Sequence, residues 1–158
     1  MRSDLKNKIM TRVKNIHFIG IGGSGMSGIA SILNDLGYIV SGSDINQSKN
    51  TDILKKNNIK ISIGHDKNNV FSKDVIVVSS AVKEDNVEYI YAKELSIPII
   101  QRAEMLAELM RFSFGIAIAG THGKTSTTSI LSHILNVANY DPTYIIGGKI
   151  INSGNFRL

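Results

Sequence analysis

The chain has 158 residues, a formal net charge of +5, 42% hydrophobic and 20% charged residues, and no cysteine. This composition is typical of a globular protein with a buried core, and it excludes disulfides and thiolate metal sites. The modest charge does not argue for a nucleic-acid partner, and no apolar run approaches the ~20 residues that span a bilayer. The basic N-terminus lacks the apolar segment of a signal peptide, so we expect a cytoplasmic protein without a membrane partner.

Residues 1–14 are polar and basic, and they form either a frayed tail or one short amphipathic helix. From residue 15 onward, apolar runs typical of strands alternate with segments of helical periodicity. The expected strands are 15–19, 38–43, 59–63, 74–79 and 98–100, and the expected helices are 26–36, 51–57, 87–95 and 102–112. This alternation predicts that residues 15–112 form one α/β domain, a Rossmann-like doubly wound parallel sheet.

A glycine-rich segment, Gly20-Ile21-Gly22-Gly23-Ser24-Gly25, directly follows the first strand. Its spacing is that of the G-x-G-x-x-G fingerprint, which lets a backbone approach a diphosphate at the start of a helix. Asp44 ends the second strand, nineteen residues after Gly25. Strand, fingerprint, helix, strand and terminal acid together indicate a nucleotide-binding unit. A helix cap or turn residue is the alternative role for Asp44.

Polar residues also follow two later strands. His65 comes after the third strand and Ser79 ends the fourth. Open α/β sheets bind ligands at this edge, so both are candidate binding residues. For His65, an ordinary solvent-facing loop position is the alternative.

A second glycine loop, Gly120-Thr121-His122-Gly123-Lys124-Thr125-Ser126, lies between an apolar run expected as a strand (114–119) and a helix expected over 124–137. This arrangement is typical of a phosphate-binding loop, in which the lysine reaches the β- and γ-phosphates and the threonine ligates Mg²⁺. The full pattern requires a glycine at position 118, where this chain has isoleucine. The loop is therefore a shortened variant, and an ordinary glycine turn is the alternative.

The second loop belongs to a different unit from the first. We place a domain boundary at residue 113, so that residues 113–158 begin a P-loop ATPase-type central domain with one further strand at 144–146. A single parallel βαβ unit leaves much apolar surface uncovered. We expect this second domain to be partial and self-association to be favoured.

Taken together, the motifs resemble those of the Mur ligase family. They comprise residues 17–30 with the first glycine loop, Ser41-Gly42-Ser43-Asp44, Gly64-His65, Ser79-Ser80-Ala81, residues 102–110, the second glycine loop, Asp141-Pro142-Thr143 and Gly147-Gly148. Within the family, the segment from Gly20 to Gly28 favours the alanine-adding member over the recycling tripeptide ligase, which stays an alternative.

The resemblance implies a three-domain enzyme that uses ATP and Mg²⁺ to join L-alanine to UDP-N-acetylmuramate through an acyl phosphate, in peptidoglycan precursor synthesis. It implies that Lys124 is catalytic and that Thr125 ligates the metal, whereas His122 has a loop role only. The implied ATP-binding residues are Gly120, Thr121, His122, Gly123, Lys124, Thr125 and Ser126. The implied UDP-sugar-binding residues are Gly20, Gly22, Gly23, Ser24, Gly25, Met26, Ser43, Asp44, His65 and Ser79.

Two readings from other classes compete. Gly20, Gly22, Gly25 and Asp44 also fit an NAD-dependent dehydrogenase, although such an enzyme has no use for the second glycine loop. A non-catalytic Rossmann module with a vestigial ATPase segment is the other rival. The family's alanine site and remaining Mg²⁺ ligands would lie beyond residue 158, so we expect the isolated chain to be inactive in ligation.

Overall fold

The computed structural model describes residues 12–111, 114–140, 142–146 and 156–157. The tail or helix expected within residues 1–14 lies almost wholly outside the described residues. The Gly147-Gly148 pair and Asp141 lie outside them too.

Five parallel strands form the main sheet, in the order β3-β2-β1-β4-β5. They are β1 (Asn15–Ile19), β2 (Ile39–Asp44), β3 (Lys60–Ile63), β4 (Val75–Val78) and β5 (Ile99–Gln101). The order extends outward from β1 in both directions, which creates a switch point between the carboxyl ends of β1 and β4. The predicted Rossmann-like, doubly wound parallel sheet is therefore confirmed.

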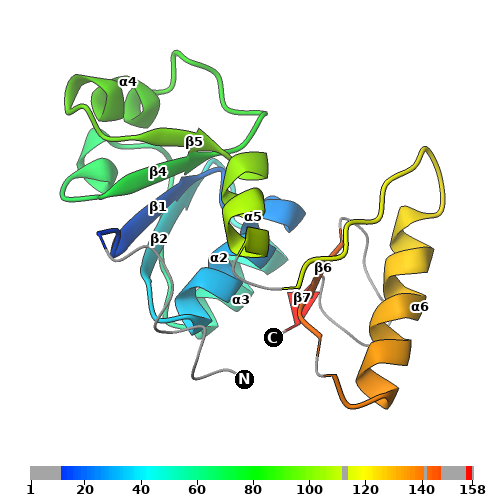
Figure 1. Cartoon of the computed structure of the whole chain (residues 1–158). Coiled ribbons are helices and arrows are strands. Elements are labelled where there is room, and N and C mark those ends of the chain that lie inside the picture. Colours follow the sequence, from blue (N-terminus) through cyan, green and yellow to red (C-terminus); the bar gives the residue numbers. More distant parts are fainter. Residues whose placement is uncertain (1–11, 112–113, 141, 147–155, 158) are drawn as a thin grey trace.

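Helices cover both faces of this sheet (Figure 1). One face carries α2 (Ser24–Asp35), α3 (Lys49–Lys56) and α5 (Arg102–Arg111), and the other carries the 3₁₀ turn η1 (Lys67–Val70) and α4 (Val87–Glu94). On β1, Ile16 and Phe18 join the larger apolar cluster under α2, whereas Ile19 joins the smaller one under α4. The period-two alternation of a strand explains this division. The η1 turn was not expected from the sequence.

The face toward α4 is partly polar. The buried strand residues His17, Ser41 and Ser43 share it with Ile76 and Val78. A central parallel strand is usually apolar on both faces, so buried hydroxyl and imidazole groups need partners in the interior. His17 Nδ1 and the Ser41 hydroxyl lie 3.0 Å apart, and the Ser43 hydroxyl donates to the carboxylate of Glu88 on α4.

The second unit differs from its prediction. Residues 114–119 form no strand, and Phe114 is 97% exposed. A strand needs a neighbour to pair its backbone groups, and the described residues offer this segment none. The short β6 (Tyr144–Ile145) pairs instead with β7 (Phe156–Arg157), and the pair is antiparallel. The prediction of a parallel βαβ unit in this region is therefore wrong for the described residues.

The helix α6 (Lys124–Val137) matches its predicted bounds. It stands away from the five-stranded sheet (Figure 1), and Ile130, Ile134 and Val137 on it are 62%, 55% and 68% exposed. Their spacing of four and three residues places them on one helix face. Self-association, and the domain boundary at residue 113, stay predictions.

Candidate functional site

The first glycine loop joins β1 to α2 and is tied to the end of β2. The N–H groups of Gly20 and Ile21 donate to the carbonyl oxygen of Ser43 at 2.9 and 3.0 Å. Gly20 has a φ of 81°, a left-handed conformation that favours glycine. The helix α2 then begins at Ser24 without a side-chain cap hydrogen bond. The N–H groups of its first turn, with the helix dipole, form a place for an anion.

Asp44 holds the same loop from the side of β2. Its Oδ2 accepts a hydrogen bond of 2.7 Å from the N–H of Gly22, and Asn50 donates to the carbonyl oxygen of Gly22 at 2.8 Å. A Cβ at position 22 would lie 2.8 Å from that carboxylate oxygen. Both the N–H and the carbonyl group of Gly22 are therefore hydrogen-bonded. The absence of a side chain at this position leaves room for the Asp44 carboxylate.

A cleft of ≈ 450 Å³ opens beside this loop, at the carboxyl edge of the sheet. The volume suits a ligand of nucleotide size, and the position is the switch point where doubly wound sheets bind ligands. Five of the residues predicted to contact the sugar nucleotide line it, namely Gly20, Gly23, Asp44, His65 and Ser79. Residues 81–83, 85 and 86 form another part of the wall, and Lys83 contributes a cation to it.

Other predicted residues do not turn their side chains to the cleft. The side chain of Met26 belongs to the apolar core, and the Ser43 hydroxyl is fully buried. Ser24 and Gly25 lie in the first turn of α2, where their backbone groups are what a ligand would meet. The structure thus brings the loop, Asp44, His65 and Ser79 together at one edge and places Met26 and Ser43 behind it.

Glu88, on α4, is a buried acid that was not among the predicted site residues. Its Oε2 accepts from the Ser43 hydroxyl at 2.5 Å and lies 3.0 Å from Nδ1 of His65. Its Oε1 accepts from the Asn69 side-chain amide at 2.6 Å and from the N–H of Asp66 at 3.3 Å. One carboxylate therefore connects β2, the loop after β3 and η1 beneath the cleft.

The charges in this buried cluster are set by their surroundings. Burial opposes the charge of Glu88, but the close contacts of His17, Ser43 and Asn69 outweigh it and lower the pKa of its carboxyl to about 2. Nε2 of His17 lies 3.7 Å from Glu88 Oε2, beyond hydrogen-bond distance, and Nδ1 lies 3.0 Å from the Ser41 hydroxyl. Burial lowers the pKa of His17 below its ordinary 6.5. At neutral pH an ionised carboxylate therefore faces a neutral imidazole.

Arg102, the first residue of α5, adds a cation near the first glycine loop. A Cβ placed on Gly25 would collide with one guanidinium nitrogen of Arg102. The third glycine of the fingerprint therefore leaves room for this side chain at the start of α2. Arg102 was quoted in the family resemblance but not among the predicted site residues, because the sequence did not show which glycine it lies against.

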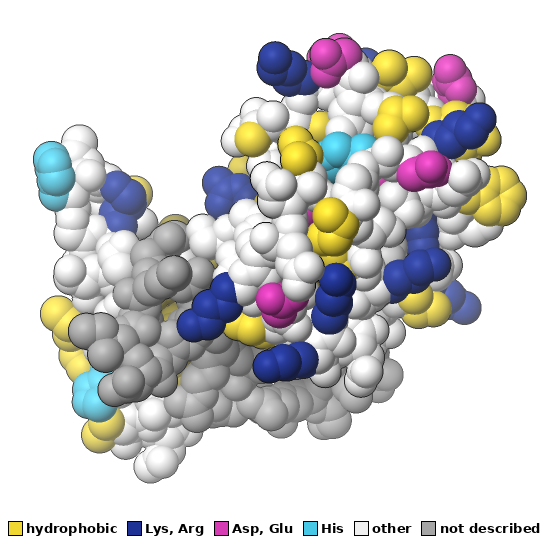
Figure 2. Space-filling view, turned by 180° about the vertical axis from the view of Figure 1, so that it is seen from behind, with side chains coloured by type: hydrophobic (Ala, Val, Ile, Leu, Met, Phe, Trp, Pro, Cys, Tyr) yellow, Lys and Arg dark blue, Asp and Glu magenta, His cyan; other side chains and the backbone are white. Residues whose placement is uncertain are grey.

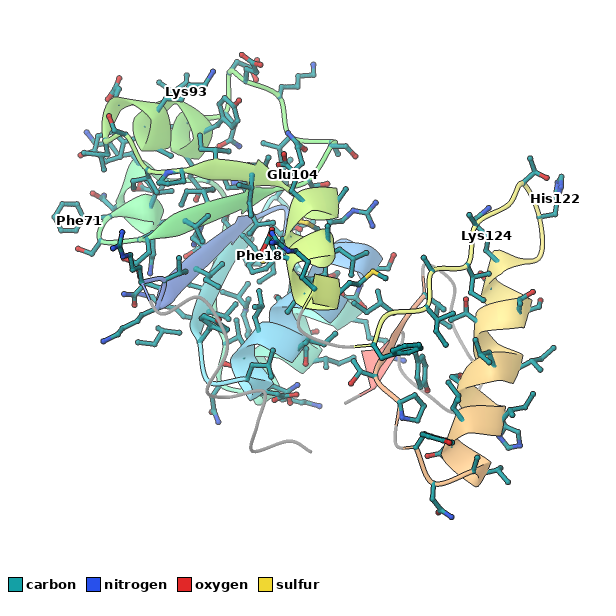
Figure 3. All side chains as sticks on the ribbon, in the orientation of Figure 1. Phe18, Phe71, Lys93, Glu104, His122 and Lys124 are labelled. Atoms are coloured by element: carbon teal, nitrogen blue, oxygen red, sulfur yellow. The ribbon has the colours of Figure 1, made fainter. Side chains whose placement is uncertain are left out.

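The second glycine loop has the backbone geometry expected of a phosphate-binding turn. Gly120 and Gly123 have φ of 149° and 77°, and α6 begins at Lys124 without a side-chain cap. The Lys124 ammonium donates to the carbonyl oxygens of Gly120 and Thr121 at 2.5 and 3.1 Å. His122 lies at the tip of the loop, and Lys124 lies along its inner side (Figure 3). The amine is thus held within the loop by the loop's own carbonyl oxygens.

Three observations limit other kinds of site in the described part of the chain. No group of three or more His, Asp or Glu side chains there could hold a metal ion. None of the described helices is long and apolar enough to cross a membrane. Basic and acidic side chains are interspersed over the face in Figure 2, which does not resemble the basic stripe of a nucleic-acid-binding surface.

Comparison with known proteins places these loops in one family. Residues 15–114 match the "Mur ligase family, catalytic domain". The chain is 62% identical over 151 residues to a UDP-N-acetylmuramate–L-alanine ligase of Ruthia magnifica subsp. Calyptogena magnifica, covering 96% of this chain and 32% of that protein. The chain thus spans about a third of the length of the curated relatives that it matches.

Solved structures give the same grouping. The UDP-N-acetylmuramate–alanine ligase MurC of Thermotoga maritima superposes with a TM-score of 0.84 at 34% identity, over 92% of this chain and 34% of that one. A UDP-N-acetylmuramate:L-alanyl-γ-D-glutamyl-meso-diaminopimelate ligase of Neisseria meningitides superposes with a TM-score of 0.85 at 33% identity, over 92% and 47%. Both are named as ligases of the same sugar nucleotide, UDP-N-acetylmuramate.

Proposed function

The chain belongs to the Mur ligase family, and from this premise we propose that it is the N-terminal part of a ligase that adds L-alanine to UDP-N-acetylmuramate. The cleft beside the first glycine loop would hold the sugar nucleotide. The whole protein's ATP-dependent reaction, its alanine partner and its role in peptidoglycan synthesis belong to the same proposal. The 62% identity to a relative named for the alanine-adding activity favours that member over the tripeptide ligase.

The observation that carries the proposal is the cleft at the switch point, whose lining includes Gly23, the residue before the uncapped start of α2, together with the polar residues Asp44, His65 and Ser79. The diphosphate would lie at the first turn of α2, beside the cation of Arg102. Asp44 and His65 would face the nucleoside, since both line the cleft. Asp44 is partly engaged already, because one of its oxygens braces Gly22. Its second oxygen accepts a 3.3 Å contact from the N–H of Asn46.

The second glycine loop fits a nucleoside triphosphate with Mg²⁺. Its two glycines with positive φ leave room for phosphate oxygens, and the N–H groups at the start of α6 point outward without a cap. Lys124 would neutralise phosphate charge, and the exposed Thr125 would ligate the metal. ATP would supply the phosphoryl group that activates the substrate's carboxylate. The role of this chain is to position and neutralise, which is what phosphoryl transfer requires of a protein.

Calorimetric titration of the 158-residue chain with UDP-N-acetylmuramate tests the proposal. We expect saturable binding, competition by UDP, and no binding of NADH at the same concentrations. A folded sample that binds NADH but not the UDP compounds would instead support the dehydrogenase reading. In a separate assay, we expect no alanine-dependent ADP release by the 158-residue chain, because it spans about a third of the length of the ligases that it matches.

A further inference from the structure

We infer that Glu88 is a positioning residue for the sugar-nucleotide site: it holds His65 with Nδ1–H turned inward and Nε2 available to the ligand. This inference rests on the proposed function, since it concerns the same cleft. His65 lines that cleft and its side chain is 16% exposed, whereas the Glu88 side chain is fully buried. Glu88 therefore acts on the ligand only through His65.

The hydrogen bonds around Nδ1 of His65 fix which ring nitrogen carries the proton. Nδ1 lies 3.0 Å from the Ser43 hydroxyl oxygen and 3.0 Å from Oε2 of Glu88. The only hydrogen of the Ser43 hydroxyl goes to Glu88, so towards His65 that oxygen can only accept. An ionised carboxylate also only accepts. Both neighbours of Nδ1 are acceptors, so Nδ1 must carry the hydrogen.

The consequence lies at the other ring nitrogen. A neutral imidazole has one N–H, so with Nδ1 protonated Nε2 presents a lone pair. Nδ1 is taken up by Ser43 and Glu88, which leaves Nε2 as the nitrogen that a ligand in the cleft can reach. Such an atom accepts a hydrogen bond from an N–H or O–H group of a nucleoside, such as a base imide or a ribose hydroxyl. Glu88 would thereby ensure that His65 offers the ligand a hydrogen-bond acceptor and not a donor.

Glu88 also fixes the place of the ring. The same carboxylate accepts from the N–H of Asp66, the residue after His65, and from the side chain of Asn69. Asn69 in turn accepts from the Ser62 hydroxyl on β3 at 2.9 Å. His65 is therefore held through its ring and through its neighbouring backbone. A second imidazole, His17, faces the same carboxylate from β1 without a hydrogen bond at Nε2.

The test reads the protonated nitrogen of His65 directly. Long-range ¹H–¹⁵N correlation spectra of the ligand-free chain at about pH 8 distinguish the two neutral tautomers from each other and from the doubly protonated ring. We expect the Nδ1–H form for His65 in the unmodified chain. In Glu88→Gln, one acceptor becomes a donor, so we expect a mixture of tautomers and UDP affinity reduced about tenfold. Glu84→Gln is the matched control, since Glu84 is exposed and forms an ion pair with the exposed Lys93, away from His65.

An Nε2–H form in the unmodified chain would overturn the inference without any variant. So would a folded Glu88→Gln protein with unchanged tautomer, whether its UDP affinity is kept or lost, because loss alone would indicate a merely structural role. Absence of UDP binding to the unmodified chain would count against the proposed function. The tautomer measurement decides the role of Glu88 independently of that result.

Discussion

Oδ2 of Asp44 accepts a 2.7 Å hydrogen bond from the backbone N–H of Gly22, so the acid that ends β2 braces the glycine loop that follows β1. In the dinucleotide fingerprint, an acid at this place hydrogen-bonds the ribose of the ligand. Here one oxygen is engaged within the protein, while the residue still lines the cleft. The two roles considered for Asp44, turn residue and binding residue, are therefore compatible.

Asp44→Ala should loosen the loop and weaken ligand binding together. Loss of a hydrogen bond between a carboxylate and a backbone N–H should lower the free energy of unfolding by about 1–3 kcal/mol. UDP affinity should fall because the start of α2 is no longer held in place. Asp52→Ala is the control, because Asp52 is a partly exposed α3 residue whose side chain accepts from Gln47. Urea unfolding and UDP titration measure both effects, and unchanged stability in Asp44→Ala would contradict the bracing role.

Gly42→Ala should destabilise the fold although Gly42 lies in no glycine loop. A Cβ there would lie 2.5 Å from Cδ1 of Ile21 and 2.9 Å from the carbonyl oxygen of Phe18. The backbone oxygen cannot move away without disturbing the sheet, where Phe18 and Gly42 are register partners. We expect a loss of about 1–3 kcal/mol or more in the free energy of unfolding.

Gly23→Ala provides the comparison for this prediction. A Cβ at Gly23 would have no contact closer than 3.6 Å, and its φ of −59° suits any residue. Thermal unfolding should therefore separate the two variants, with Gly42→Ala melting well below Gly23→Ala. Equal melting temperatures would contradict the packing argument.

The fold class and most element positions of the first domain followed from the alternation of apolar runs and helical periodicity, whereas the strand order came from the structure. The strand expected at 114–119 failed for a physical reason. Phe114 and Ile116 have the apolar character of a strand, but both are exposed and the described chain gives them no paired neighbour. The local residue pattern indicates only a propensity to form a strand, whereas a stable strand also requires a neighbouring strand with which to pair.

The residues that line the cleft were predicted where their place depends on backbone shape, and Glu88 was missed because its place depends on side chains distant in the sequence. Their binding roles stay predictions. Glycine spacing located both loops, and strand ends located Asp44, His65 and Ser79. Asn86 caps α4 by accepting from its first N–H groups, and Glu88 lies in the first turn of that helix. An acid at this place is usually explained by its favourable interaction with the helix dipole, so there was no reason in the sequence to single it out. The polar strand residues Ser41 and Ser43 were a signal, since buried hydroxyls require a buried partner.

Lys124→Ala should remove nucleoside triphosphate binding with little effect on stability. Lys124 contacts only carbonyl oxygens of its own exposed loop among the described residues, so the fold loses little when it is truncated. A phosphate loses its main cationic partner, and we expect ATP affinity in the presence of Mg²⁺ to fall at least about tenfold. Lys56→Ala, an exposed lysine on α3, is the control for charge alone. ATP binding that survives in Lys124→Ala would remove this residue from the proposed phosphate site.

Stability should fall in acid in two stages. The pKa of His17 is lowered by burial, so the folded state resists protonation that the unfolded chain accepts, and stability declines as the pH falls below about 6.5. The carboxyl of Glu88 has a folded pKa of about 2 against an ordinary 4.5. Its contribution, up to about 3 kcal/mol, is present above pH 4.5 and is lost as the pH falls towards 2. Asp74, whose pKa is lowered by backbone hydrogen bonds from Asn15 and Lys14, adds to the second stage.

Urea unfolding at a series of pH values separates these contributions. Glu88→Gln should be less stable at neutral pH and should lose less stability between about pH 4.5 and 2 than the unmodified chain, because its side chain does not titrate. Asp74→Asn should reduce the same acid dependence but leave the His65 tautomer unchanged, since Asp74 contacts the start of β1 instead of the cleft. An acid dependence that is identical in Glu88→Gln and the unmodified chain would show that the Glu88 carboxylate is not stabilised by the fold.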